Sequence, residues 1–338
     1  MAAPSLSVRQ KRTGTVEHNA MKQLVRSQGF GAVIGVAVML AVFTLIDFSG
    51  WWTVQTVSNV TQFASILALV AIGQALVIMT KEIDLSVGSV YGLAGVSFIT
   101  LEPALGVPGS LVLALLIAAL AGLVQGVAVV KGQLPSMIVT LGGLFTARGI
   151  IYVWTGGSVH NFSPDARAHP LTRLLGGELF GVEAATFWLI AISALLSLML
   201  WATPFGNRLL ATGGGRESAE SRGVRTERVK IVTFVLCSLL AGFAGILTLC
   251  NQPQTHVTLG ENMELEAISA AVIGGCLLTG GRGSILGAIL GALIVVSFRY
   301  ELIALGAPSS WYITFVGVAL IAAVIFNQSL ARRLGHSV

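Results

Sequence analysis

Long apolar runs without a charged residue fill most of the sequence, and they limit what the chain can fold into. Hydrophobic residues make up 54% of the 338 residues and charged residues only 10%, which is more apolar surface than a soluble domain of this length can bury. We therefore expect an all-α polytopic membrane protein. At roughly 20 apolar residues per spanning helix, the runs predict about ten transmembrane helices, at residues 30–47, 58–80, 85–101, 111–130, 134–154, 186–203, 231–250, 265–280, 284–303 and 311–327.

The positions of Lys and Arg predict the orientation of these helices. If both termini are cytoplasmic, all but four of the 20 basic residues lie on the cytoplasmic side, as the positive-inside rule requires. The net charge of +5 then follows from topology, and we expect no nucleic-acid partner. The expected organisation is a cytoplasmic tail (1–29), a transmembrane domain (30–330) with an outer loop at 155–185 and an inner loop at 204–230, and a second cytoplasmic tail (331–338).

The 204–230 loop contains six basic and three acidic residues around three consecutive glycines. We expect a turn at Gly213–Gly215 and a short helix at 217–222 that is closed by Gly223, since glycine commonly follows the end of a helix. Composition alone allows two interpretations of this loop. It is either a solvated connector or a docking helix for a cytoplasmic partner.

No catalytic or metal-binding pattern stands out. The sequence lacks the GxxxxGK[ST], HExxH and GxSxG patterns, so we expect no enzyme activity, no metal and no cofactor, and an energy source on another chain. Cys237, Cys250 and Cys276 lack CxxC spacing and are expected to be packing residues. Arg148 is the clearest charge inside a span, where it either reaches the outer interface or lines an internal cavity.

Neutral polar residues within the spans are the candidates for a translocation pathway, because amides and hydroxyls exchange hydrogen bonds with a neutral polyhydroxylated solute. Hydrogen bonding between helices is the alternative for each of them. The candidates are Asn59, Gln62, Gln74, Thr146 and, at the outer end of its span, Asn161.

Glycines at helical spacing predict contact stripes between helices rather than substrate sites. They occur as Gly88 and Gly92, Gly122 and Gly126, and Gly283, Gly287 and Gly291.

Four segments, in this order, resemble the permease subunits of ribose-type (carbohydrate uptake) ABC importers, the inner-membrane component of binding-protein-dependent transport systems. They are AIGQALVIMTKEIDLSVGS (71–89), LGGLFTARGIIYVWTGG (141–157), ATGGGRESAESRGV (211–224), and MELEAISAAVIGG (263–275) with LTGGRGSILGAILGA (278–292). The resemblance covers roughly residues 55–327. The branched-chain amino-acid permeases have a similar GGxGS block but lack the DLSVG form, which favours a sugar-like solute.

The resemblance implies a bacterial inner-membrane permease that works with a cytoplasmic ATP-binding subunit, an extracytoplasmic substrate-binding protein and a second permease chain, identical or paralogous. The solute is then a monosaccharide or related polyol. The coupling residues that the resemblance implies are Ala211, Gly213, Gly214, Arg216, Glu217, Ala219 and Gly223. The turns of the family motifs contain Asp84, Ser86, Gly88, Gly281, Arg282 and Gly283.

The chain departs from this family at two points. Lys81 and Glu82 stand where the family usually has two glycines, at a tight inner turn, and Glu266 stands where it often has Asp. An ion-coupled secondary carrier remains the alternative function. The poverty of ionisable residues in the spans disfavours it, and an intramembrane enzyme is a weaker alternative because no nucleophile and base can be paired.

The predicted topology is testable by reporter fusions. Fusions after Gly176 and after Gly215 should report opposite sides of the membrane, with Gly215 in the cytoplasm, because an odd number of spans separates the two positions in the predicted arrangement. If both fusions report the same side, the arrangement with ten spans is wrong.

Overall fold

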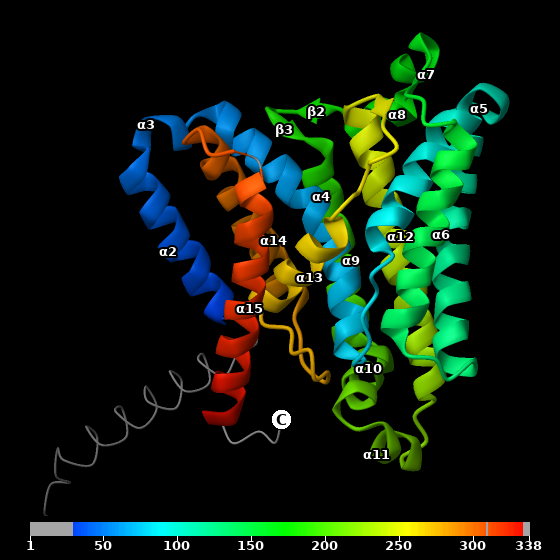
Figure 1. Cartoon of the computed structure of the whole chain (residues 1–338), viewed down its shortest axis with the longest axis vertical. Helices are drawn as coiled ribbons and strands as arrows, with labels where there is room; N and C mark the ends of the chain where they lie inside the picture. Colours follow the sequence, from blue (N-terminus) through cyan, green and yellow to red (C-terminus); the bar gives the residue numbers. More distant parts are fainter. Residues whose placement is uncertain (1–29, 309, 334–338) are drawn as a thin grey trace, which may run out of the picture.

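The computed structural model describes residues 30–308 and 310–333, which form a helical bundle (Figure 1). The expected tail at 1–29 and the end of the expected tail at 331–338 lie outside the described residues. The long helices are α2 (Phe30–Ile46), α4 (Val54–Met79), α5 (Val87–Lys131), α6 (Ser136–Thr155), α9 (Ala184–Ala202), α12 (Thr226–Asn251), α14 (Ile285–Ala304) and α15 (Ser310–Arg333). The short helices are α3 (Phe48–Trp51), α7 (Pro164–Ala168), α8 (Pro170–Gly176), α10 (Pro204–Gly214), α11 (Arg216–Ser221) and α13 (Met263–Ile273).

Short elements lie at both ends of the bundle (Figure 1). One end, which we call the strand end, carries α7, α8 and two small antiparallel sheets: β1 (His160–Asn161) with β4 (Gln254–Thr255), and β2 (Glu178–Leu179) with β3 (Val182–Glu183). The opposite end carries α10 and α11, and we call it the α11 end.

Seven helices in the described part of the chain are long and apolar enough to cross a membrane: α4, α5, α6, α9, α12, α14 and residues 310–329 of α15. α2 is also apolar but shorter. The chain is therefore a multi-pass helical protein.

α5 is a helical hairpin of two antiparallel arms rather than one continuous helix. Gly106 has a left-handed φ of 67° with ψ of 171°, between Pro103 and Pro108. Ala94 in the first arm and Ala118 in the second both lie against Gly242 of α12, although a straight helix would separate them by about 36 Å. The arms correspond to the separate spans expected at 85–101 and 111–130.

α4 is the central helix of the bundle. Every residue from Ala64 to Met79 is buried, and α9, α12, α13 and α14 pack around it. A helix that is apolar on all sides needs such enclosure. Before α4 lies the short helix α3, which is capped by Asp47: the Asp47 carboxylate accepts the Gly50 N–H at 2.9 Å.

The helix in the region of the span expected at 265–280 is shorter than the sequence predicts. α13 ends at Ile273 and has 11 residues, about 16 Å of helix, which is too short to cross a bilayer of about 30 Å. The helix ends because Gly275 adopts a left-handed φ of 95°, as Gly280 and Gly281 do further on. The chain from 274 to 284 is irregular.

The glycine stripes lie at close contacts, as their spacing predicts. Side chains at these positions would collide with backbone: at Gly88 with Gly260, at Gly122 with Phe234, and at Gly291 with Ala270. Gly88 and Gly92 contact the irregular segment at Leu259 and Gly260 rather than the side of a helix, and Gly283 lies just before α14.

The contact between the second arm of α5 and α12 gives a stability prediction. Gly122→Val places a side chain against the Phe234 carbonyl and Ser238, and overpacking of this kind costs roughly 1–3 kcal/mol. We expect a lower midpoint of thermal unfolding in detergent. The control is Gly142→Val on α6, where an added Cβ has no atom within 4 Å, and its midpoint should stay close to that of the unsubstituted protein.

Candidate functional site

The turn between α4 and α5 is a buried polar structure at the α11 end. The Asp84 carboxylate accepts hydrogen bonds from the Ser86 N–H (2.8 Å) and the Ser86 hydroxyl (2.7 Å) through Oδ1. Ser86 Oγ also lies 2.9 Å from Oε1 of Gln125, on the second arm of α5. Asp84 is fully buried, and its Oδ2 has no hydrogen-bond partner among the described residues.

Helices α4 and α6 hold the same turn from two other sides. With its amide oriented to satisfy both groups, Gln74 donates to the Asp84 carbonyl (3.1 Å) and accepts from the Asp84 N–H (3.3 Å). The Ile83 N–H donates to Ser136 Oγ and the Ile83 carbonyl accepts from Thr140 Oγ1, both at 3.3 Å. The fully buried Gln74 thus serves this turn in the structure, and its place in a pathway stays a prediction.

Lys81 and Glu82 are accommodated in two different ways. Lys81 has a left-handed φ of 67°, a conformation that glycine adopts without steric cost, so a glycine at this point of the turn would be unstrained. Glu82 forms an ion pair with Lys230, one turn into α12.

The segment that contains the expected coupling residues, 211–223, has more helix than the sequence predicts. Gly213 and Gly214 are the last two residues of α10, so the turn lies at Gly215 alone. α11 occupies 216–221 and is closed by Gly223, which has a φ of 80°. Ala211, Gly214, Arg216, Glu217 and Gly223 are exposed, and Gly213 and Ala219 are buried.

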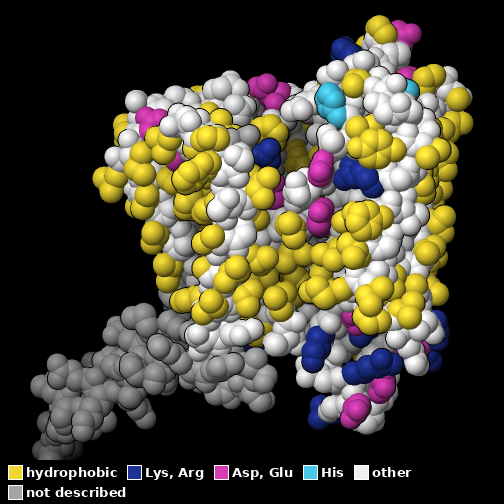
Figure 2. All heavy atoms as spheres, in the orientation of Figure 1, with side chains coloured by type: hydrophobic (Ala, Val, Ile, Leu, Met, Phe, Trp, Pro, Cys, Tyr) yellow, Lys and Arg dark blue, Asp and Glu magenta, His cyan; other side chains and the backbone are white. Residues whose placement is uncertain are grey.

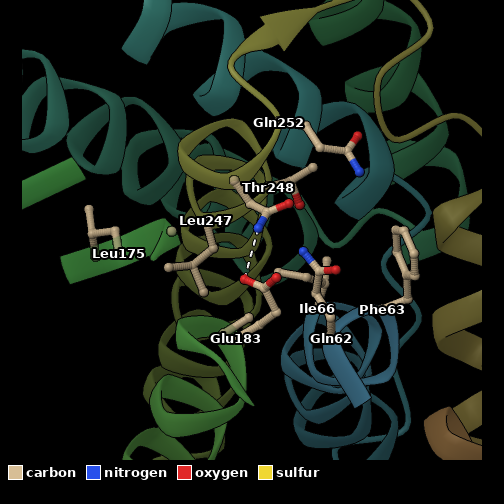
Figure 3. Close-up of a pocket in the computed structure, with 11 residues that line it drawn as sticks. Gln62, Phe63, Ile66, Leu175, Glu183, Leu247, Thr248 and Gln252 are labelled. Atoms are coloured by element: carbon tan, nitrogen blue, oxygen red, sulfur yellow. Dashed lines mark hydrogen bonds between the residues drawn. The ribbon is translucent and has the colours of Figure 1, made fainter. Parts of the chain in front are cut away.

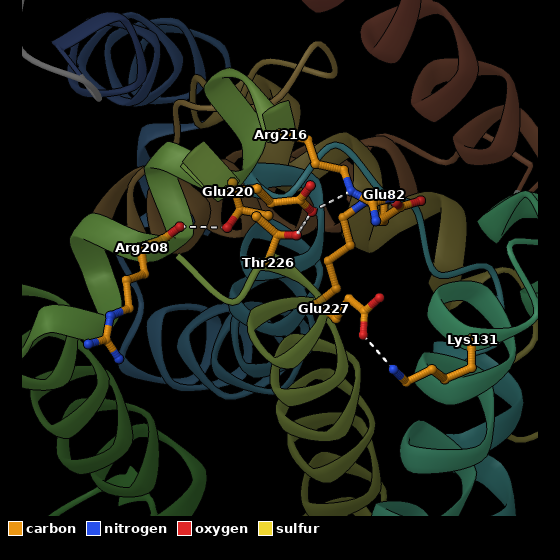
Figure 4. Close-up of polar contacts among 9 residues, drawn as sticks. Glu82, Lys131, Arg208, Arg216, Glu220, Thr226 and Glu227 are labelled. Carbon is orange, nitrogen blue, oxygen red and sulfur yellow. Dashed lines mark hydrogen bonds and ion pairs between the residues drawn. The ribbon is translucent and has the colours of Figure 1, made fainter. Parts of the chain in front are cut away.

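Glu220 forms hydrogen bonds with residues at the start of α11 and at the start of α12. It accepts from Arg216 Nε at 2.8 Å and from Thr226 Oγ1 at 2.5 Å (Figure 4). These hydrogen bonds, first the one from Thr226 and then the one from Arg216, lower the pKa of Glu220.

Three backbone segments meet at the last residue of α4. The Met79 carbonyl accepts the Gly281 N–H at 2.9 Å. A side chain at Gly213 would collide with that carbonyl oxygen, and Gly283 lies against the Met79 side chain. A cleft of about 550 Å³ opens beside this junction and is lined by residues of the 80–82 turn, the 212–216 segment and the 277–282 loop, Arg282 included.

The proposed pathway residues are not gathered at one place. Asn59 is half-buried on α4 and accepts from Gln55 at 3.0 Å. Thr146 is exposed on α6, which packs chiefly against α5, and Asn161 lies in β1. Gln62 lines a small cavity near the strand end beside the hydrogen bond between Glu183 and Asn251 (2.9 Å; Figure 3). With a volume of about 20 Å³, that cavity has room for a water molecule but not for a sugar.

Charged contacts around α13 are the polar feature that the sequence reasoning missed. Half-buried Arg148 donates to the carbonyls of Val257 (2.8 Å) and Leu259 (3.0 Å), a role that neither of its expected placements describes. Arg299 lies 3.8 Å from Glu266 and over the Tyr312 ring. Figure 2 shows acidic and basic side chains within the apolar belt on one face. In the sequence, the charged residues within apolar runs are the signal that could have indicated these contacts.

The buried Asp84 carboxyl predicts a dependence of stability on pH. Burial raises the pKa of Asp84 from 3.8 to about 6, against the opposing hydrogen bonds from Ser86. The folded state therefore disfavours the ionised form, and this penalty is complete above about pH 6 and vanishes below the ordinary pKa of Asp.

We expect Asp84→Asn, which keeps the Oδ1 acceptor, to raise the free energy of unfolding at pH 7.5 by on the order of 2–3 kcal/mol. The gain should shrink as the pH falls from 6 to 4. Unfolding midpoints in detergent across this range check the expectation, with Asp165→Asn on exposed α7 as the control. A loss of stability at pH 7.5 would show instead that the turn needs the charge.

Comparisons with known proteins agree with the resemblance that the motifs carry. Residues 56–324 match the family described as the permease component of the branched-chain amino acid transport system. The autoinducer 2 import system permease protein LsrC of Escherichia coli O9:H4 (strain HS) is 36% identical over 301 residues, 87% of each chain. The protein of the same name from Photorhabdus luminescens is 32% identical over 311 residues, 92% of each chain. No solved structure matches the chain at a significant level. Because the match covers most of its length, the chain belongs to this family of ABC importer permeases, as its motifs predict.

Proposed function

We propose that this chain is the membrane-spanning subunit of a bacterial inner-membrane ABC importer for a sugar-like solute. The names of its relatives identify import of autoinducer 2, and a monosaccharide, a related polyol or autoinducer 2 itself fits the neutral polar residues of the spans. ATP hydrolysis is assigned to a separate cytoplasmic subunit. The proposal includes ten crossings with both termini in the cytoplasm, which the distribution of basic residues supports. The eighth crossing is made by α13 together with the irregular segments on either side of it, which lead from β4 at the strand end to Gly281 at the α11 end.

The observation that carries the proposal is the connection between the α10–α11 segment and the centre of the bundle. This segment is exposed, charged and placed at the end of the molecule, where a partner has access. Its buried Gly213 lies directly against the carbonyl end of α4, the most enclosed helix. A displacement of α10 by a docked partner therefore reaches α4 through backbone contacts alone.

Such an importer needs two global states, with its pathway open to one side or to the other. ATP binding closes the partner subunits, and the coupling segment transmits that motion to the helices. An outer binding protein delivers the solute, and a second permease chain completes the pore. Asn59, Gln62, Gln74 and Thr146 stay the predicted contacts of the pathway, which holds its solute loosely so that release is fast.

An uptake experiment tests this function. Proteoliposomes with the permease, its cognate ATP-binding subunit and binding protein should accumulate autoinducer 2 or ribose when ATP is enclosed with the ATP-binding subunit, and not with an ion gradient alone. Uptake driven by an ion gradient without ATP would instead support the secondary carrier.

A substitution at Gly214 tests the role of the coupling segment. Gly214 is exposed, and an added Cβ there has no atom within 4 Å, so Gly214→Trp should leave the fold intact. The bulky side chain lies on the proposed docking surface, and we expect uptake to fall by more than about tenfold, equivalent to roughly 1.4 kcal/mol of barrier. Gly317→Trp on α15, which is also exposed and where an added Cβ has no atom within 4 Å, is the matched control. Equal uptake in both variants would contradict the assignment of residues 211–224.

A further inference from the structure

A nearly buried ion pair joins the turn between α4 and α5 to the base of α12. Lys230 contacts Glu82, and each side chain is only 14% exposed. The turn that contains Glu82 also contains the buried Asp84 and is tied by hydrogen bonds to α4, α5 and α6. The pair therefore connects α12 to a part of the molecule that is already held from three other sides.

A second ion pair provides an internal comparison. Lys131, the last residue of α5, contacts Glu227 in the first turn of α12 at 2.5 Å (Figure 4). It has the same residue types and reaches the same helix, but its side chains are 64% and 42% exposed. Water and salt screen such an exposed pair, whereas a nearly buried pair is screened much less.

The Glu82–Lys230 pair lies between the turn and the coupling segment. Two clefts of about 550 and 540 Å³ lie next to it, and Glu82, Lys230 and Arg216 of α11 line both of them. α11 is fastened to the start of α12 by the hydrogen bond between Glu220 and Thr226. A movement of α11 is thus carried into the first turns of α12, where Lys230 stands.

We propose that Glu82 and Lys230 are positioning residues for transport, because their ion pair transmits displacement of the α10–α11 segment and the base of α12 to the buried 80–86 turn. This inference rests on the proposed function and names a connection within the same site. The ion pair is a second, electrostatic connection between the α10–α11 segment and the bundle, in addition to the backbone contact at Gly213. Removal of one partner leaves a nearly buried charge without its counter-ion and takes away this link between the turn and α12.

The experiment uses the reconstituted importer with autoinducer 2 as the probe and measures ATP hydrolysed per molecule taken up. We expect Glu82→Gln and Lys230→Met each to raise this ratio by about threefold or more, because a nearly buried pair is strongly affected by loss of one member. The control variants Glu227→Gln and Lys131→Met should change it by less than about 1.5-fold, because exposed pairs contribute little. The amount of ATP-binding subunit that copurifies with each variant is measured in parallel and should be unchanged.

Two further variants separate transmission from folding. Glu82→Lys combined with Lys230→Glu restores an ion pair with reversed polarity and should return the ratio toward that of the unsubstituted protein, and the conservative Glu82→Asp should retain it. An unchanged ratio in Glu82→Gln, or loss of the ATP-binding subunit from that variant, would overturn the inference. Failure of the unsubstituted importer to show ATP-dependent uptake would overturn the proposed function instead.

Discussion

The end of α4 is the point on which the arrangement of the α11 end depends, because three backbone segments meet there without room for a side chain. The Met79 carbonyl accepts the Gly281 N–H, and Gly213 of α10 lies against the same oxygen. Any Cβ at Gly213 would push α10 away from α4. Close backbone approach at glycine holds helices together in lipid, where no hydrophobic force acts between them. Here it also places an exposed surface segment within one contact of the central helix.

The turn that follows this junction is held by hydrogen bonds from two helices. A turn with buried backbone polar groups is stable only when they have partners, and here Gln74, Ser136 and Thr140 supply them from two different helices. The Asp84 carboxylate satisfies Ser86 but leaves its own Oδ2 without a partner among the described residues. The turn is therefore well connected in its backbone and carries one costly buried group.

The sequence predicts the helices and the family of this protein well, since apolar runs and motif order are local information. Fold details that depend on contacts between distant segments were harder. The triple glycine at 213–215 suggests a turn, yet Gly213 and Gly214 are helical, and Gly213 packs against the end of α4. The hydropathy of 265–280 suggests a full span, yet α13 stops at Ile273. The contact of Gln74 with the backbone of Asp84 could not be predicted either, because nothing in the helix of Gln74 reveals the turn beside it.

Arg148 and the break before α13 compensate for each other. Residues 256–262 form no regular helix or strand in the structure, so the carbonyls of Val257 and Leu259 lack helical partners, which is costly at membrane depth unless protein groups satisfy them. The guanidinium of Arg148 carries five donors and needs acceptors for the same reason. Each group alone violates the rules for a membrane interior, and together they satisfy them. The charge in the fifth expected span and the irregular segment that precedes α13 are thus two sides of one structural feature, although they lie more than a hundred residues apart in the sequence.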